Sequence, residues 1–131
     1  KIIGNYRALA PDIVDMLDDA LERTAKNSRT TLAVALNYGS QDELVRAAQA
    51  AAAQGMITAQ SIEANLDTAD MPPLDLLIRT SGEQRLSNFM LWQAAYAEFW
   101  FTETLWPDFN KAEVARALDV FAGRERRFGG R

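Results

Sequence analysis

The sequence contains no cysteine and no histidine among its 131 residues. Without cysteine there is no disulfide framework, no thiol nucleophile and no cysteine-based metal site. Without histidine the chain lacks the most common general base and the most common zinc ligand. A metal bound by this chain would therefore be a hard cation held by carboxylates, for which Mg²⁺ is the natural candidate.

An excess of positive charge is also missing. Lysine and arginine number 14, and aspartate and glutamate number 18, which gives a formal net charge of -4. This balance argues against a general nucleic-acid binder, which needs a basic face to neutralise phosphates. A small basic cluster near the C-terminus, Arg124, Arg126, Arg127 and Arg131, could still hold one small anion.

Long hydrophobic runs are absent as well. No stretch approaches the roughly 20 apolar residues that a membrane-spanning helix needs. The opening residues do not resemble a signal peptide, so we expect a cytoplasmic protein. Because Ile2 and Ile3 look like the middle of a strand, we expect the sequence to start inside a larger domain.

What the sequence does contain is an alternation of strand and helix patterns. Ser40 is expected to cap the helix that follows it, with Glu43 completing a capping box. The alternation indicates an α/β fold with a mainly parallel β-sheet and helices on both faces. The predicted strands are residues 2–4, 30–36, 74–78 and 99–102, and the predicted helices are residues 11–26, 40–55, 59–66, 88–98 and 111–121.

The most informative segment is residues 75–89, DLLIRTSGEQRLSNF. A buried strand ends at Arg79, a polar loop follows, and Ser87 stands where the next predicted helix begins. Ligands of open α/β sheets collect beyond the carboxyl ends of strands, and a helix N-terminus favours anions. Two guanidinium groups, from Arg79 and Arg85, together with the Ser87 hydroxyl would suit a phosphate or diphosphate.

The same residues have simpler interpretations. Ser87 could only cap the predicted helix, Arg79 could form a structural ion pair with Glu83, and Arg85 could be a solvated loop residue. From the residue chemistry alone, the diphosphate site and these structural roles are about equally supported.

Three ordered motifs resemble those of the cis-prenyltransferases of the undecaprenyl diphosphate synthase type. Residues 75–98, with Trp106-Pro107-Asp108-Phe109 behind them, are similar to the last signature region of that family. Asn37-Tyr38-Gly39 resembles its short mid-chain motif, and residues 124–130, RERRFGG, resemble its C-terminal tail. The resemblance implies that residues 1–131 are the C-terminal part of a single cis-prenyltransferase domain.

This resemblance implies an activity and a set of binding residues. The family condenses isopentenyl diphosphate with an allylic prenyl diphosphate and forms Z double bonds repeatedly. Its bacterial members make the C55 carrier lipid of cell-wall synthesis. Arg79, Arg85 and Ser87 would bind isopentenyl diphosphate, with the backbone at Leu86 nearby.

The resemblance also implies a metal ligand and a homodimer. Glu98 would help to hold Mg²⁺, and Arg127 and Gly129 would reach across the dimer into the site of the partner subunit. If residues 88–98 were helical, Glu98 would lie about 16 Å from Ser87, too far for one metal to join them directly. A structural ion pair is therefore the alternative for Glu98.

The first signature of the family, which holds the allylic diphosphate and the main metal-binding aspartate, has no counterpart in this sequence. It is expected before Lys1, together with the segment implicated in proton removal, so this chain alone is expected to be inactive. Two other hypotheses remain: a non-catalytic partner subunit of a prenyltransferase complex, and an unrelated phosphate-binding α/β module. The first is disfavoured because such subunits usually lose the arginines that this chain keeps.

Overall fold

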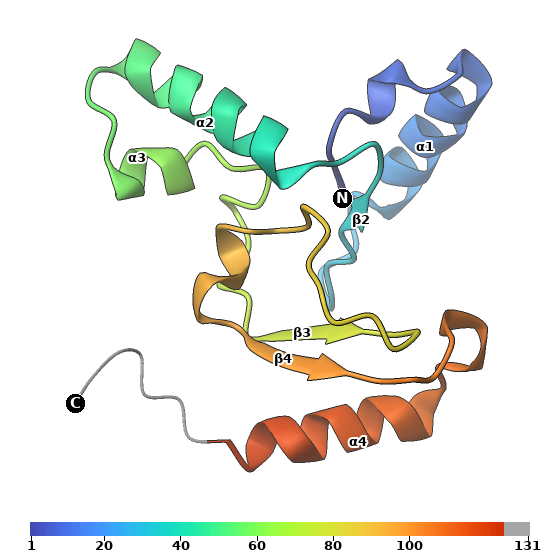
Figure 1. Cartoon of the computed structure of the whole chain (residues 1–131). Helices are drawn as coiled ribbons and strands as arrows, with labels where there is room; N and C mark the ends of the chain where they lie inside the picture. The colour runs from blue at the N-terminus through green and yellow to red at the C-terminus, as the bar shows by residue number, and fades with distance from the viewer. Residues whose placement is uncertain (125–131) are drawn as a thin grey trace. The chain divides into compact units, whose positions relative to one another are not determined.

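The computed structural model describes residues 1–124, which form two compact units (Figure 1). The first unit is Lys1–Met71 and the second starts at Pro72. Arg127 and Gly129 lie outside the described residues.

The first unit is built around a short parallel strand pair. β1 (Ile2–Ile3) pairs with β2 (Val34–Ala35), and the 14-residue helix α1 (Pro11–Thr24) lies between them in the chain. Pro11 occupies the first turn of α1, where its missing N–H has no helical partner to lose. The predicted strand at residues 30–36 was too long, because only the two residues opposite β1 are paired.

The helices α2 (Ser40–Gln54) and α3 (Ala59–Glu63) complete the first unit and pack against each other (Figure 1). α3 begins with a capping box, in which Thr58 and Ser61 bind each other's backbone N–H groups. α3 ends earlier than the predicted residue 66. The buried apolar residues of this unit are Ile3, Ala47, Ala51 and Leu66.

The capping box predicted for α2 is wrong. Gly39 is the N-cap, Ser40 is already the first helical residue, and no side chain caps the helix. Glu43 is instead buried, with 1% of its surface exposed. Its carboxylate accepts a 2.5 Å hydrogen bond from the Tyr38 hydroxyl and a 2.9 Å one from the Asp67 N–H.

The second unit contains a parallel strand pair of four residues each. β3 (Leu76–Arg79) pairs with β4 (Glu98–Phe101), and the 12-residue helix α4 (Lys111–Ala122) runs beside them (Figure 1). Two 3₁₀ turns, η2 (Gln93–Tyr96) and η3 (Trp106–Asp108), flank β4. The buried apolar residues of this unit are Leu77, Ala94 and Ala117.

The helix predicted at residues 88–98 does not form. Ser87, Asn88 and Met90 have φ values of 48°, 62° and 48°, in the left-handed region that a right-handed helix cannot contain. Helical geometry is confined to the short turn η2, and Glu98 is the first residue of β4. The apolar spacing that suggested a helix instead belongs to an irregular segment that ends in a strand.

The α/β fold class with parallel strands is confirmed. Both strand pairs are parallel, and helices lie between successive strands of the first unit and after the second pair. Among residues 1–124, no helix combines the length and the apolarity needed to cross a membrane.

Candidate functional site

The carboxyl end of β3 brings together three of the residues singled out in the sequence. Nη1 of Arg79 donates to the backbone carbonyl of Arg85 at 2.6 Å and lies 3.3 Å from Oγ of Ser87. Arg79 is half-buried, whereas Arg85 and Ser87 are exposed. The loop therefore folds back on the strand end and places the Arg79 guanidinium against the backbone of Arg85 and the hydroxyl of Ser87, with Leu86 between these two residues in the chain.

Arg85 is exposed, and it forms an ion pair within the loop. Its Nη1 pairs with the carboxylate of Glu83, and both side chains remain partly exposed. The ion pair that Glu83 forms is with Arg85, and the alternative pairing of Glu83 with Arg79 is not among the ion pairs of residues 1–124. An anion arriving at this cluster would compete with Glu83 for the Arg85 guanidinium.

Ser87 does not act as a helix cap. Its φ of 48° places it inside a left-handed turn, and no helix begins at the next residue. The contribution that a helix N-terminus was expected to make to anion binding is therefore absent at this position. Any attraction that this segment had for an anion would have to come from the guanidinium groups, which donate charge-assisted hydrogen bonds, and from the hydroxyl, which is a neutral donor.

Backbone hydrogen bonds hold the start of the loop against the end of β4. The N–H of Ser81 donates to the carbonyl of Thr104 at 2.9 Å, and that of Gly82 donates to the carbonyl of Thr102 at 2.8 Å. Both Ser81 and Gly82 have a φ of 69°. A side chain at Gly82 would approach Oε2 of Glu103 to 2.5 Å, so glycine allows this close contact.

Glu98 lies apart from the arginine cluster along the strands. It pairs with Leu76, at the opposite end of the ladder from Arg79, which pairs with Phe101. Three residues of strand correspond to roughly 10 Å. The expected 16 Å helical separation is wrong because no helix connects Ser87 to Glu98.

The Glu98 carboxylate forms an ion pair within the chain. Its Oε2 lies 2.7 Å from Nη1 of Arg124, which also donates to the carbonyl of Phe99 at 2.9 Å. Residues 1–124 contain no group of three or more acidic side chains that could hold a metal ion. By themselves these residues do not fit a magnesium site, since a single ion-paired carboxylate is too few ligands.

The first unit holds the Asn37-Tyr38-Gly39 motif in a polar network. The Asn37 side chain donates to the carbonyl of Asn5 at 3.0 Å, and the Asn5 N–H donates to the carbonyl of Asn37 at 3.1 Å. Next to it, Asp67 accepts from the N–H of Gly4 at 2.9 Å and from both Nη atoms of Arg46 at 3.0 Å. The Arg46 guanidinium, supported by the Gly4 N–H, lowers the pKa of Asp67 although partial burial acts against it.

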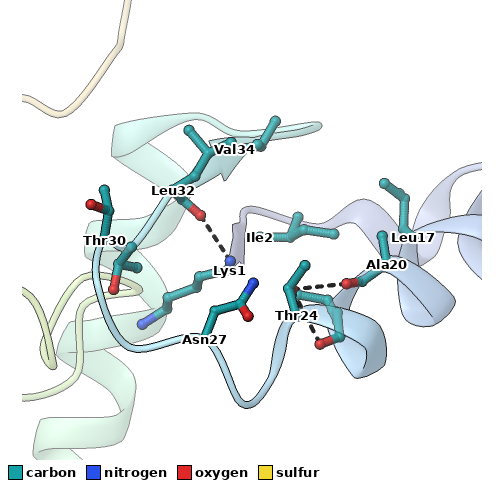
Figure 2. Close-up of a pocket in the computed structure, with 11 residues that line it drawn as sticks. Lys1, Ile2, Leu17, Ala20, Thr24, Asn27, Thr30, Leu32 and Val34 are labelled. Carbon is teal, nitrogen blue, oxygen red and sulfur yellow. Dashed lines mark hydrogen bonds between the residues drawn. The ribbon is translucent and has the colours of Figure 1, made fainter.

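A separate hollow of about 360 Å³ lies in the first unit, between α1, β1 and the segment leading to β2 (Figure 2). Beside this hollow, the backbone nitrogen of Lys1 donates a 2.8 Å hydrogen bond to the carbonyl of Leu32. None of the predicted site residues lines it. Its lining is mainly aliphatic, with Ile2, Leu17, Ala20, Leu21, Leu32 and Val34 alongside Lys1, Thr24, Asn27, Thr30 and Thr31.

Sequence reasoning missed the polar residues that support these loops. Glu43 was interpreted as part of a cap, and Asp67, Thr102 and Glu113 were not singled out. The spacing of Asn110 and Glu113 matches a capping pair, and Asn110 does cap α4, so that pattern could have drawn attention to Glu113. Nothing in the local pattern around Asp67 indicates its contacts, because they join residues far apart in the chain.

Known proteins resemble this chain over almost its whole length. The family model described as "Putative undecaprenyl diphosphate synthase" matches residues 1–129. The chain belongs to the cis-prenyltransferase family. The isoprenyl transferase of Zymomonas mobilis is 52% identical over 99% of the chain, and isoprenyl transferase 2 of Bradyrhizobium diazoefficiens is also 52% identical. The chain covers 56% and 55% of these proteins, so it spans about half the length of the curated relatives it matches.

Two solved structures share its fold. The crystal structure of a "probable undecaprenyl diphosphate synthase" from Campylobacter jejuni has a TM-score of 0.88 at 35% identity, over 98% of this chain and 62% of that one. The lavandulyl diphosphate synthase of Lavandula x intermedia, solved with dimethylallyl diphosphate, has a TM-score of 0.92 at 36% identity. It matches 98% of this chain and 59% of that one.

Proposed function

We propose that this chain supplies the isopentenyl diphosphate site of a cis-prenyltransferase. The whole enzyme would condense isopentenyl diphosphate with an allylic prenyl diphosphate and make a long Z-polyprenyl diphosphate of the undecaprenyl type. The observation that carries this proposal is the cluster at the carboxyl end of β3, where Arg79 contacts both the Arg85 carbonyl and the Ser87 hydroxyl. Membership of the family supports it.

The chemistry of the cluster suits a diphosphate. A guanidinium carries five N–H donors, more than the two contacts of Arg79 use, and its planar fork matches pairs of phosphate oxygens. Arg85 adds a second guanidinium, and Ser87 and the backbone at Leu86 add neutral groups. Held here, isopentenyl diphosphate would have its double bond fixed relative to the allylic carbon, so the contribution of these residues is positioning and electrostatic.

The undecaprenyl product is proposed from the family description and from the Campylobacter jejuni neighbour. The lavandulyl diphosphate synthase has a similar identity, 36% against 35%, although its name states a different product. Product length therefore requires direct measurement, by thin-layer chromatography of the dephosphorylated products against polyprenols of known length.

A role for Mg²⁺ is also proposed. Glu98 would contribute one carboxylate to a cation that neutralises diphosphate charge, with its other ligands coming from outside this chain and from substrate. Because Glu98 is paired with Arg124, this role requires the ion pair to open. Glu98→Gln is expected to raise the Mg²⁺ concentration needed for half-maximal activity, and an unchanged requirement would leave Glu98 with the structural pairing alone.

The proposed enzyme is a homodimer in which Arg127 and Gly129 of one subunit complete the diphosphate site of the other. The test uses the full-length enzyme and mixes a subunit that ends at Arg124 with a subunit carrying Arg79→Ala and an intact tail. Each variant alone is expected to be nearly inactive, whereas the mixed dimer regains one working site. No recovery, with heterodimers verified by native mass spectrometry, would show that the tail does not act on the partner.

The function is tested by kinetics in a complete transferase, made by placing this chain in the matching segment of the Zymomonas mobilis enzyme. Arg79→Ala is expected to lower kcat/KM for isopentenyl diphosphate by at least about tenfold, since a charge-assisted contact contributes about 1.5–3 kcal/mol. Arg79→Lys should restore only part of the loss, because an ammonium lacks the fork. The control is Arg23→Ala, an exposed arginine of α1.

An unchanged KM for isopentenyl diphosphate in both Arg79 variants would refute the assignment. The 131-residue chain by itself is expected to incorporate no isopentenyl diphosphate into butanol-extractable product with any allylic substrate. Incorporation by the chain alone would refute the proposal that it carries only part of the active site.

A further inference from the structure

Glu113 is a buried carboxylate that contacts the two threonines bonded to the loop after β3, residues 80–87. It lies in the first turn of α4, with 8% of its surface exposed. Its Oε2 accepts from the hydroxyl of Thr104 at 3.1 Å and lies 3.4 Å from that of Thr102. Its Oε1 lies 3.1 Å from Nη1 of Arg116, which is largely exposed.

The two threonines that contact Glu113 are the same two whose carbonyls hold the loop. The hydroxyl oxygen of Thr102 also accepts a 3.2 Å hydrogen bond from the N–H of Thr104, which fixes the backbone between the two threonines. The carbonyl of Thr102 accepts from Gly82, that of Thr104 accepts from Ser81, and the N–H of Thr102 donates to the carbonyl of Arg79. A continuous set of hydrogen bonds thus runs from α4 to the end of β3.

The loop needs such support because its backbone is strained. Ser81 has a φ of 69°, which a residue other than glycine adopts only when its surroundings impose it. Ser81 and Gly82, whose N–H groups donate these hydrogen bonds, follow Arg79 and Thr80 directly in the chain. If they were lost, the loop would relax and the distance from Arg79 to Arg85 and Ser87 would no longer be fixed.

We propose that Glu113, through Thr102 and Thr104, is a positioning residue that holds the Arg79–Arg85–Ser87 cluster in its diphosphate-binding arrangement. This inference rests on the proposed function. Glu113 acts at one remove, because it contacts the threonines and not the cluster itself. The expected consequence of its loss is a disordered loop on an intact strand pair.

The experiment measures amide hydrogen exchange by NMR, together with isopentenyl diphosphate binding by calorimetry, in the complete transferase that carries this chain. In Glu113→Ala, exchange at the N–H groups of Ser81 and Gly82 is expected to rise at least tenfold, while the helical amides of Ala47 and Ala51 stay unchanged. The dissociation constant for isopentenyl diphosphate should rise about tenfold. Asp119→Asn, an exposed carboxylate of the same helix, serves as the control and should change neither quantity.

Milder variants keep the test decisive if Glu113→Ala fails to fold. Thr104→Val removes the hydroxyl at nearly constant shape and should also speed the exchange of the Ser81 and Gly82 amides. Thr104→Ser keeps the hydroxyl, so these amides should exchange as slowly as in the parent. Glu113→Gln keeps an accepting oxygen and should give an intermediate result. A purely structural role would lower thermal stability without this dependence on the hydroxyl.

The outcomes separate this inference from the function on which it rests. If Ser81 and Gly82 exchange at the original rate in Glu113→Ala and Thr104→Val, the positioning role is wrong even if Arg79→Ala abolishes binding. If the unaltered transferase does not bind isopentenyl diphosphate, the proposed function fails, and the role of Glu113 in binding fails with it. In that case faster exchange would still identify Glu113 as the support of the loop.

Discussion

Each of the two units contains one buried glutamate in the first turn of a helix, and the two carboxylates are used differently. Glu43 in α2 accepts from a backbone N–H 24 residues away and from a tyrosine hydroxyl. Glu113 in α4 contacts two threonine hydroxyls and an exposed arginine. Glu43 therefore joins segments of the first unit directly, whereas Glu113 acts on a loop through intervening side chains.

The difference extends to the glycines. A side chain at Gly4 would lie 2.5 Å from the carbonyl oxygen of Leu36 and 2.8 Å from Cβ of Tyr38, in contact with atoms that cannot move away. A side chain at Gly82 would meet only the end of the flexible Glu103 side chain. A side chain at position 4 would therefore meet fixed backbone atoms, whereas one at position 82 would meet a side chain that can move aside.

The largest predicted effect on stability is the loss of the Glu43 carboxylate. Glu43→Ala is expected to lower the free energy of unfolding by roughly 2–5 kcal/mol, because it removes a buried acceptor shared by two part-buried donors and opens a cavity. The measurement is urea unfolding followed by circular dichroism. Asp42→Ala, its exposed neighbour, should cost no more than about 0.5 kcal/mol.

Tryptophan fluorescence sharpens this comparison, because all three tryptophans, Trp92, Trp100 and Trp106, lie in the second unit. Glu43→Ala should shift the circular dichroism transition more than the fluorescence transition. Equal shifts by both probes would contradict a stabilising effect confined to the first unit.

The next largest contrast is between two glycine substitutions. Gly4→Ala is expected to destabilise by roughly 3 kcal/mol, from backbone strain at a φ of 88° plus a clash with fixed atoms. Gly82→Ala should cost about 1–2 kcal/mol, from strain alone. Gly55→Ala is the control for strain without a clash, since nothing lies within 4 Å of a side chain there. A larger loss for Gly82→Ala than for Gly4→Ala would reverse the comparison.

A pH dependence is expected in the first unit from Asp67. Its pKa is lowered in the folded chain, chiefly by Arg46, so the unfolded chain binds the proton more readily. The stability contributed by this carboxylate is complete above its unfolded pKa of about 3.9 and is lost as the pH falls through the lower folded value. Asp67→Asn should therefore be less stable than the parent at pH 7, with the difference shrinking at acid pH. A difference that grows on acidification would contradict this.

The smallest effect is expected for Arg116, the ion-pair partner of Glu113. Its side chain is 64% exposed, so Arg116→Ala should cost about 0.5 kcal/mol or less. It should leave the exchange of Ser81 and Gly82 slow, because the threonine contacts remain. Faster exchange at these amides would show that the ion pair, and not the hydroxyl contacts, orients Glu113.

The sequence predicted the fold class and the residues of the arginine cluster, because strand periodicity and ordered motifs are local features. It predicted the wrong structure at residues 88–98. The apolar spacing there favours a helix, but the positive φ values of Ser87, Asn88 and Met90 exclude one. Backbone conformations of that kind are imposed by tertiary contacts and leave little trace in composition.

The wrong helix also led to two wrong inferences about the site. Ser87 was given a helix N-terminus that does not exist, and Glu98 was placed at a helix end when it begins β4. The supports of the loop were missed for a related reason, since Thr102 and Glu113 act across elements and their pairing cannot be inferred from spacing. The roles of Arg79, Arg85 and Ser87 in binding, and the dimer contacts of Arg127 and Gly129, stay predictions.

The most direct test of the central claim is a titration of the complete ¹⁵N-labelled transferase that carries this chain with isopentenyl diphosphate, followed by NMR. Saturable shifts are predicted for the amides of residues 79–90, with inorganic pyrophosphate shifting the same amides, and Arg79→Ala should abolish them. Shifts that fall outside this segment, or that persist unchanged in Arg79→Ala, would contradict the assignment of the diphosphate site to the arginine cluster.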